Sequence, residues 1–166
     1  MNSKKTVGSF VVLTKNDKKE VFLVKRSDFP VWEFQGGGIE DGETPKECAV
    51  REAFEETGFK IKILRKIAVY INHENKRVDS HVYEGEIISG KYCREYPECE
   101  GKWFNINLLP KEMVEVRKTM IQDCVSNQKK LIKRESPRSI YYKNMKLFLS
   151  MPFRSIKYVV VKLFKF

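Results

Sequence analysis

The chain has 166 residues, of which 42% are hydrophobic and 33% charged, and its formal net charge is +10. This length and composition predict one domain with a full core. The chain contains no run of about 20 apolar residues, and its first residues lack the apolar stretch of a signal peptide. We therefore expect a cytoplasmic protein without a membrane-spanning helix. The four cysteines form no Cys-x-x-Cys pair, which predicts free thiols rather than a zinc site.

The positive charge is concentrated near the C-terminal end of the chain. Residues 1–126 contain 21 Lys or Arg and 21 Asp or Glu, whereas residues 127–166 contain 11 Lys or Arg and a single acidic residue, Glu135. This shift predicts two parts, a domain over residues 1–126 and a basic, aromatic-rich extension over residues 127–166.

Apolar stretches bounded by turn residues predict strands and helices in alternation over the first part. Strands are expected at residues 6–14, 20–25, 59–71, 78–88 and 102–105, and the third of these is long enough for one strand or two. Helices are expected at residues 45–57 and 109–125. Strands around one central helix, followed by a later helix, indicate a mixed sheet between helices.

The first of these helices has clear end signals. Thr44 is a typical N-cap residue, Pro45 suits the first helical position, and Glu47 stands where a capping box needs a carboxylate. Gly58 follows as a C-terminal stop. The sequence thus predicts both ends of the helix from local chemistry alone.

One face of this helix is crowded with carboxylates. Glu52, Glu55 and Glu56 stand at positions i, i+3 and i+4, so they are neighbours on the helix surface. The side expected to be buried is formed by Val50, Ala53, Phe54 and Thr57. Carboxylates this close repel one another unless a cation lies between them, and oxygen-only ligands suit Mg²⁺ or Mn²⁺. Because Mg²⁺ in proteins is usually bound by carboxylates together with substrate phosphates, we expect a phosphate-containing substrate.

Residues 37–59 resemble the Nudix box, the signature Gly-x5-Glu-x7-Arg-Glu-U-x-Glu-Glu-x-Gly-U, in which U is a bulky aliphatic residue. Ala53 and Phe59 stand at the two U positions and depart mildly from the pattern. The matching residues are Gly37, Glu43, Arg51, Glu52, Glu55, Glu56 and Gly58. A solvated acidic helix after a turn would not explain this fixed spacing.

The resemblance implies a fold and an activity. The fold is α/β, a Nudix-type α/β/α sandwich with a mixed β-sheet, and it covers about residues 5–126. The activity is metal-dependent hydrolysis of the pyrophosphate bond of a nucleoside diphosphate linked to another group.

The resemblance also implies a cation site, with Mg²⁺ as the expected cation and Mn²⁺ as the alternative. The implied ligands are Glu52, Glu55, Glu56 and a backbone carbonyl of Gly36 or Gly37. Arg51 is expected to pair with Glu43 or Glu52 and to fix the carboxylate orientation. The alternative for Arg51 is ordinary pairing on the helix surface.

A further catalytic base is expected outside the box. Glu98 is favoured, because its Pro-Glu-x-x-Gly loop before an aromatic strand is similar to the corresponding loop of bacterial RNA 5′-pyrophosphohydrolases. Glu100 in the same loop is the alternative, and Glu84 and Glu86 are weaker candidates. A solvated loop carboxylate remains the alternative role for Glu98.

The substrate is expected to meet residues on both sides of the glycine run. The expected contacts are a phosphate on Arg26, a base stacked on Trp32 or Phe34, and close backbone approach at Gly37 and Gly38. Core packing is the alternative for Trp32. Gln35 stands where related enzymes usually have proline, which we expect to affect the loop without removing a ligand.

The substrate itself is open at this point. A (d)NTP is favoured, since the residues around the glycines resemble those of MutT-type enzymes. The alternatives are the 5′ end of RNA, which the basic extension favours, or a Nudix module that binds nucleotides without cleaving them. For residues 127–166, three partners remain open: RNA, an anionic membrane surface, or the domain itself or a second subunit in a homodimer.

Overall fold

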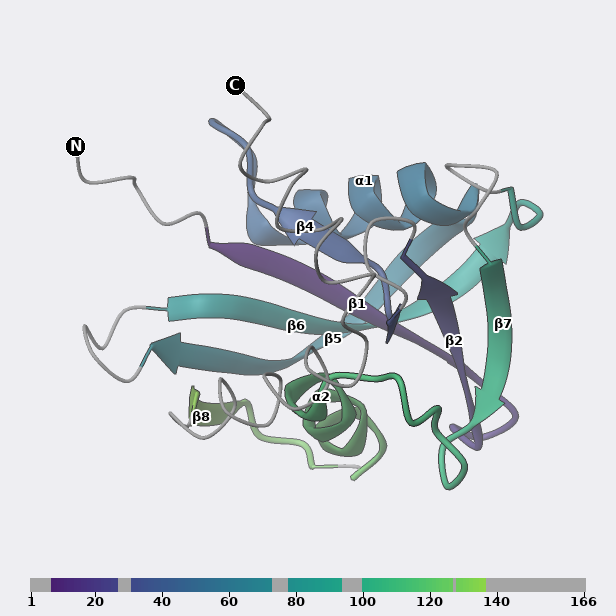
Figure 1. Cartoon of the computed structure of the whole chain (residues 1–166). Coiled ribbons are helices and arrows are strands. Elements are labelled where there is room, and N and C mark those ends of the chain that lie inside the picture. Colours follow the sequence, from purple (N-terminus) through teal and green to yellow (C-terminus); the bar gives the residue numbers. More distant parts are fainter. Residues whose placement is uncertain (1–6, 27–30, 73–77, 94–99, 127, 137–166) are drawn as a thin grey trace, which may run out of the picture.

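The computed structural model describes residues 7–26, 31–72, 78–93, 100–126 and 128–136 (Figure 1). The strands are β1 (Gly8–Lys15), β2 (Glu20–Lys25), β3 (Trp32–Glu33), β4 (Gly36–Gly38), β5 (Lys60–Asn72), β6 (Val78–Ser89), β7 (Glu100–Asn105) and β8 (Ile132–Ser136). The helices are α1 (Pro45–Thr57) and α2 (Glu115–Val125).

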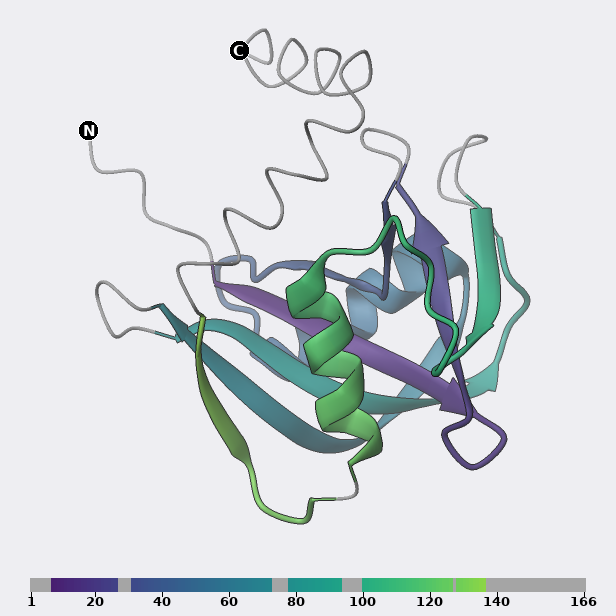
Figure 2. The same cartoon turned by 60° about the horizontal axis from the view of Figure 1, so that its bottom comes forward.

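The strands form one mixed sheet between the two helices. Its order is β3-β2-β1-β6-β5-β8, with β4 paired to β1 and β7 paired to β2. The β1–β6 and β5–β8 pairs are parallel, and the other strand pairs are antiparallel. Helix α1 lies on one face of the sheet and α2 on the other, as Figures 1 and 2 show from two directions. The expected α/β fold with a mixed sheet between helices is confirmed.

Strand β1 is buried on both faces and divides the core in two. Val11 and Leu13 pack under α1, whereas Phe10 and Val12 pack under α2. This is the alternation that the period of a strand imposes. Strand β1 therefore contributes side chains to the core under each helix.

The buried stripe of α1 differs from the one expected. Cys48, Ala49, Ala53 and Thr57 are buried, but Phe54 is 52% exposed, so the expectation that Phe54 faces the core is wrong. The small side chains at positions 49 and 53 let the helix axis lie close to the sheet. Phe54 is the next residue along the helix after Ala53, so its side chain points away from that contact.

The sheet also continues into a strand that the sequence did not reveal. Residues of β8 pair with β5 from Ala68–Ile132 to Asn72–Ser136, past the expected boundary at residue 126. Among the described cysteines, Cys48 and Cys124 are free thiols and both are buried. Cys99 lies outside the described residues. Within the described part of the chain, no helix is long and apolar enough to cross a membrane.

The buried Asp123 carboxylate joins α2 to β5 and β8, and a second buried carboxylate, Glu84, binds two cations on the same side of the sheet. The Asp123 carboxylate accepts hydrogen bonds from the Tyr70 hydroxyl at 2.8 Å and from Arg134 Nε and Nη2 at 2.8 and 2.6 Å. Glu84 lies between Lys18 Nζ at 2.7 Å and Arg65 Nε at 2.6 Å. Because an unpaired buried carboxylate is strongly destabilising, each cation is needed where it lies.

We expect Arg134→Met to lower the free energy of unfolding by about 2 kcal/mol, since it leaves the Asp123 charge without its cation. Tyr70→Phe removes one hydrogen bond and should cost about 1 kcal/mol. Urea denaturation measures both. Lys133→Met, the same substitution at the exposed neighbouring residue, is the control. Equal losses in Arg134→Met and Lys133→Met would contradict the role given to the ion pair.

Candidate active site

The ends of α1 are fixed as the sequence predicts. The Glu47 N–H donates to Thr44 Oγ1 at 3.2 Å and the Thr44 N–H donates to Glu47 Oε2 at 2.9 Å, which completes the capping box. At the other end, Gly58 has a φ of 72° and its N–H donates to the Phe54 carbonyl at 2.7 Å. These caps fix the residues at which α1 begins and ends.

The glycine strand β4 lies directly against this face. A side chain at Gly36, whose φ is 153°, would overlap the Ser9 carbonyl, and one at Gly37 would overlap the Glu52 carboxylate. Only glycine therefore allows the backbone of β4 to approach both β1 and α1 this closely. The Glu52 carboxylate occupies the space that a side chain at position 37 would fill.

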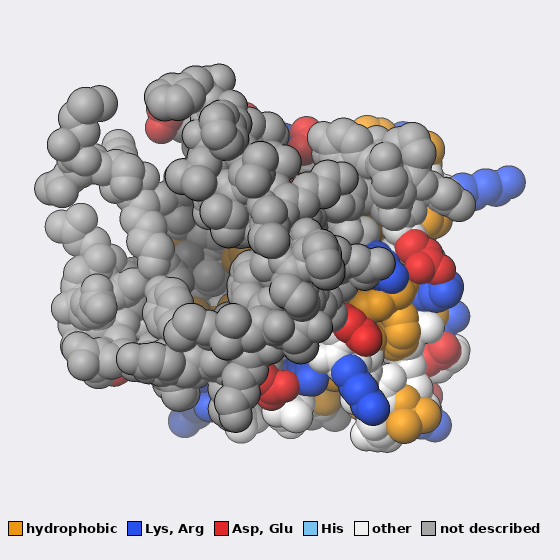
Figure 3. All heavy atoms as spheres, viewed as in Figure 1, with side chains coloured by type: hydrophobic (Ala, Val, Ile, Leu, Met, Phe, Trp, Pro, Cys, Tyr) orange, Lys and Arg blue, Asp and Glu red, His pale blue; other side chains and the backbone are white. Residues whose placement is uncertain are grey.

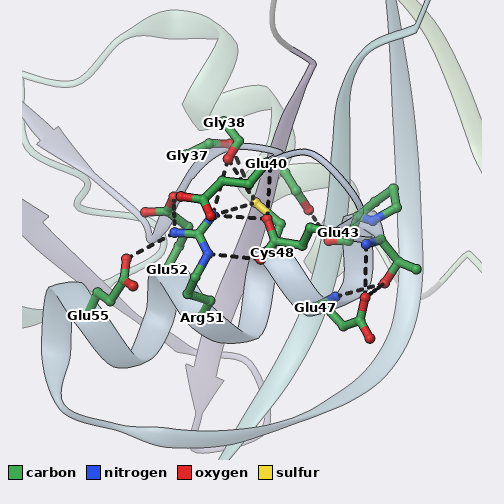
Figure 4. A network of polar contacts seen from close by, with 12 residues as sticks. Gly37, Gly38, Glu40, Glu43, Glu47, Cys48, Arg51, Glu52 and Glu55 are labelled. Atoms are coloured by element: carbon green, nitrogen blue, oxygen red, sulfur yellow. Dashed lines mark hydrogen bonds and ion pairs between the residues drawn. The ribbon is translucent and has the colours of Figure 1, made fainter.

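Arg51 is the centre of the polar network that Figure 4 shows. Its Nε and Nη2 donate to the two oxygens of Glu43 at 2.8 and 3.0 Å, a bidentate pair. Its Nη1 donates to Glu52 Oε1 at 2.9 Å and to Glu55 Oε2 at 3.0 Å. Nη2 also donates to the Gly38 carbonyl at 3.2 Å. One guanidinium thus holds three carboxylates and the end of the glycine strand, which is more than the pairing with Glu43 or Glu52 that we expected.

This network shifts the protonation of its members in opposite directions. Hydrogen bonds from Arg51 lower the pKa of Glu43 to about 2. Burial raises the pKa of Glu52 above the ordinary value, although Arg51 opposes that effect. Burial also raises the pKa of the Cys48 thiol to about 12, so Cys48 is not a nucleophile near neutral pH.

Glu56 has a different partner, the glycine strand itself. The Gly36 N–H donates to Glu56 Oε2 at 3.2 Å. Over the described residues, no three His, Cys, Asp or Glu side chains are close enough together to hold a metal ion. In this arrangement Arg51 lies between Glu52 and Glu55, and Glu56 points to Gly36. The three glutamates still share one helix face beside backbone carbonyls, so their donor chemistry fits a hard divalent cation once the side chains turn.

The aromatic residues before the glycine strand are buried. Phe34 is 2% exposed and packs edge-on against Phe10, so its ring has no open face for a base in this arrangement. Trp32 is also buried and packs against Phe104 with ring centroids 4.7 Å apart. This burial favours the core-packing alternative for Trp32. Arg26 is exposed, with Nη1 3.5 Å from Glu33 Oε2.

Arg117 on α2 contacts Phe10 and Glu33 on the other side of the sheet from α1, and the sequence did not reveal it. Its guanidinium carbon lies 3.8 Å from the centre of the Phe10 ring, and its Nε lies 3.7 Å from Glu33 Oε1. Glu33 therefore lies between Arg117 and Arg26. Nothing local in the sequence marks Arg117, because its partners are distant along the chain.

The candidates for a catalytic base lie in different places. Glu98 lies outside the described residues. The Cys93 N–H before it donates to the Thr57 carbonyl at 2.8 Å, so the chain leaves for this loop from the C-terminal end of α1. Glu100 begins β7 and forms an ion pair with Lys102.

The two weaker candidates lie on β6. Glu84 is buried on the α2 side of the sheet between Lys18 and Arg65, which gives it a structural role. Glu86 is exposed farther along the same strand, opposite Lys62 on β5.

Comparison with known proteins identifies relatives over most of the described fold. The sequence model of the NUDIX domain matches residues 4–124. A protein of Bacillus subtilis (strain 168) named "Putative 8-oxo-dGTP diphosphatase" is 38% identical over 119 residues, which is 71% of this chain and 78% of the relative. An RNA pyrophosphohydrolase of a Nitratiruptor species is 37% identical over 87 residues, 49% of this chain and 56% of that protein.

Solved structures show the same architecture at low sequence identity. An ADP-ribose pyrophosphatase from Streptococcus suis 89-1591 has a TM-score of 0.66 at 17% identity, covering 80% of this chain and 100% of that chain. A NUDIX hydrolase from Nitrosomonas europaea has a TM-score of 0.65 at 19% identity, covering 82% of each chain. At these identities the likeness establishes the fold and leaves the substrate open.

The Glu43–Arg51 pair predicts a defined loss of stability in acid. The pKa of Glu43 is about 2 when folded, against an ordinary value of 4.5. As the pH falls below that ordinary value, the unfolded chain takes up a proton that the folded protein does not, so the free energy of unfolding falls until the pH nears 2. Glu43→Gln removes this titration, so the stability gap between wild type and variant should shrink from about pH 6 to about pH 3. Thermal unfolding of wild type and Glu43→Gln across this pH range measures the stability gap, with Glu115→Gln as the control. A gap that stays constant with pH would refute the pairing of Glu43 with Arg51.

Proposed function

Because this chain belongs to the Nudix hydrolase family, we propose that it hydrolyses the pyrophosphate bond of a nucleoside triphosphate in a reaction that needs a divalent cation. The observation that supports this proposal is the position of the α1 carboxylates against the glycine strand, with Arg51 bonded to both. The family matches over residues 4–124 give the reaction class.

The proposed cation ligands are Glu52, Glu55 and Glu56, with the Gly37 carbonyl as a further donor and Mg²⁺ or Mn²⁺ as the cation. Such a cation supplies positive charge to the phosphate oxygens and makes water a better nucleophile. Glu55 is half exposed and able to turn without leaving a buried space. The raised pKa of Glu52 fits a carboxylate that gains from a nearby cation.

A few further residues are proposed to orient the cation ligands or to bind the substrate. Arg51 holds Glu43 by two hydrogen bonds and is thereby fixed beside Glu52, so it sets the direction of that carboxylate. The backbone at Gly37 and Gly38 lets a phosphate approach α1. Arg26 is proposed as a phosphate contact, because it is exposed at the end of β2.

Two further roles are proposed from the sequence. Glu98 is proposed as the base that removes a proton from the attacking water, because its loop leaves from the C-terminal end of α1. As a stacking partner for the nucleobase of the substrate, the buried Trp32 is a weaker candidate than we expected. Phe34 would have to leave the core to stack on a nucleobase.

A (d)NTP is the proposed substrate because the relative from Bacillus subtilis, whose name includes 8-oxo-dGTP diphosphatase, aligns over 78% of its own length. The second candidate is the 5′ end of RNA. It is favoured by the RNA pyrophosphohydrolase relative and by the net +10 charge of residues 127–166. On the described face in Figure 3, basic and acidic side chains are interspersed over β2 and β7.

The remaining expectations stay proposals. A module that binds nucleotides without cleaving them is disfavoured, because every carboxylate and the arginine of the box are present. Free thiols at Cys48 and Cys124 suit a cytoplasmic location. Residues 137–166 lie outside the described residues, and contact of the extension with RNA, an anionic membrane or a second subunit remains a prediction.

The substrate class is tested by product analysis. The purified chain would be incubated with dNTPs, oxidised dGTP, ADP-ribose, dinucleoside polyphosphates and 5′-triphosphate RNA, each with Mg²⁺, with Mn²⁺ and with EDTA. Release of pyrophosphate from a dNTP, abolished by EDTA, is the expected result. Preference for 5′-triphosphate RNA would replace the first candidate by the second. Turnover that persists in EDTA would contradict the need for a cation.

We expect Glu56→Gln to lower the cation-dependent kcat at least about 100-fold, because the amide keeps the shape of the side chain but loses the charge. Glu47→Gln is the matched control on the same helix, since glutamine also completes a capping box. Circular dichroism would verify that both variants fold. Near-normal turnover by Glu56→Gln would refute the ligand assignment.

A further inference from the structure

The side chain of Gln35 lies in an unusual environment for a polar group. It lies between β3 and β4, is 0% exposed, and neither its Oε1 nor its Nε2 has a hydrogen-bond partner among the described residues. Its backbone is well held, since the Val11 N–H donates to the Gln35 carbonyl at 2.9 Å. A buried carboxamide without partners loses its bonds to water and gains none in return.

The fold alone does not account for this glutamine. An unbranched apolar side chain of similar length would fill the same space without the loss of hydrogen bonds to water. Buried polar groups that cost stability in one arrangement are often satisfied in another, at sites where the protein must rearrange. The explanation therefore lies in what is close to Gln35 along the chain.

Gln35 is adjacent to the residue that holds Glu56. The Gly36 N–H donates to Glu56 Oε2 at 3.2 Å. The amide nitrogen of residue 36 is roughly 2.4 Å from the Cα of residue 35 by covalent geometry, so Glu56 Oε2 is within roughly 5.6 Å of the Gln35 Cα. An extended glutamine side chain spans roughly 5 Å, by bond lengths of the same size. The carboxamide is therefore within hydrogen-bonding reach of the Glu56 carboxylate after a change of rotamer.

We propose that Gln35 is a positioning residue for Glu56. When Glu56 turns from the Gly36 N–H to hold a cation, Gln35 Nε2 donates a hydrogen bond to the Glu56 carboxylate and fixes its direction. The Nε2 group, which lacks a partner when Glu56 is bonded to Gly36, gains one in the cation-bound arrangement. Cation binding therefore relieves a cost that the resting fold bears. This inference rests on the proposed function, because it needs Glu56 as a ligand.

The test uses Gln35→Met, which keeps the length of the side chain and removes its polar atoms. Without added cation, we expect the Tm of Gln35→Met to rise by a few degrees, because the cost of the buried amide is gone. The dissociation constant for Mn²⁺, measured by titration calorimetry, should rise about tenfold, as it does when a group that orients a ligand is lost. Gln122→Met, the same substitution at an exposed position on α2, should change neither quantity.

The outcomes separate this inference from the proposed function. If Gln35→Met binds Mn²⁺ with wild-type affinity, the inference is overturned and the proposed function is not. A lower Tm for Gln35→Met would also overturn the inference, because it would show that the carboxamide is satisfied in the resting fold. In a Glu56→Gln background, Gln35→Met should cause no further loss of Mn²⁺ affinity, and a full tenfold loss there would show that Gln35 does not act through Glu56. A wild-type protein that binds no Mn²⁺ would overturn the proposed function and this inference with it.

Discussion

The guanidinium of Arg51 balances a crowd of carboxylates, and the arrangement of the site depends on that balance. Glu43, Glu52 and Glu55 all accept hydrogen bonds from it, and Glu56 lies on the same helix face. One positive charge against these four carboxylates leaves the face strongly negative. The bidentate bond to Glu43 uses the best geometry that arginine offers, so Arg51 is anchored there and shared with the others. The negative charge that remains is the charge that a divalent cation would neutralise.

This balance requires α1 and the glycine strand to be in close contact. Ala49 and Ala53 let the helix approach the sheet, and Gly37 lets the Glu52 carboxylate lie against the backbone. The Gly38 carbonyl then lies near enough to accept a bond from Arg51. Small residues on both sides of the contact thus determine where the charged groups lie, and a side chain at position 37 would move the Glu52 carboxylate first.

The parts of this site that the sequence predicted are those fixed by local geometry. The capping box, Gly58 and the pairing of Arg51 with Glu52 follow from spacings of a few residues, so a helix assignment was enough to predict them. Helical periodicity does not determine which edge of the apolar side of α1 the sheet covers. For that reason Phe54 was wrongly expected to face the core. Strand β8 and the burial of Gln35 depend on pairing and packing between distant segments, for which the sequence carries no local signal.

On the opposite face of the sheet, ion pairs connect α2 to the strands next to the proposed substrate contacts. Glu33 on β3 lies between Arg26 and Arg117, and Arg117 is held in place by the docking of α2. That docking depends at the far end of the helix on the buried Asp123 carboxylate and its bonds to Tyr70 and Arg134. Arg117 lies at Glu33 Oε1 and Arg26, the proposed phosphate contact, at Glu33 Oε2, so one carboxylate joins α2 to the end of β2. A continuous series of contacts thus runs from the edge of the sheet at β8 along α2 to Glu33 and to Arg26 at the end of β2.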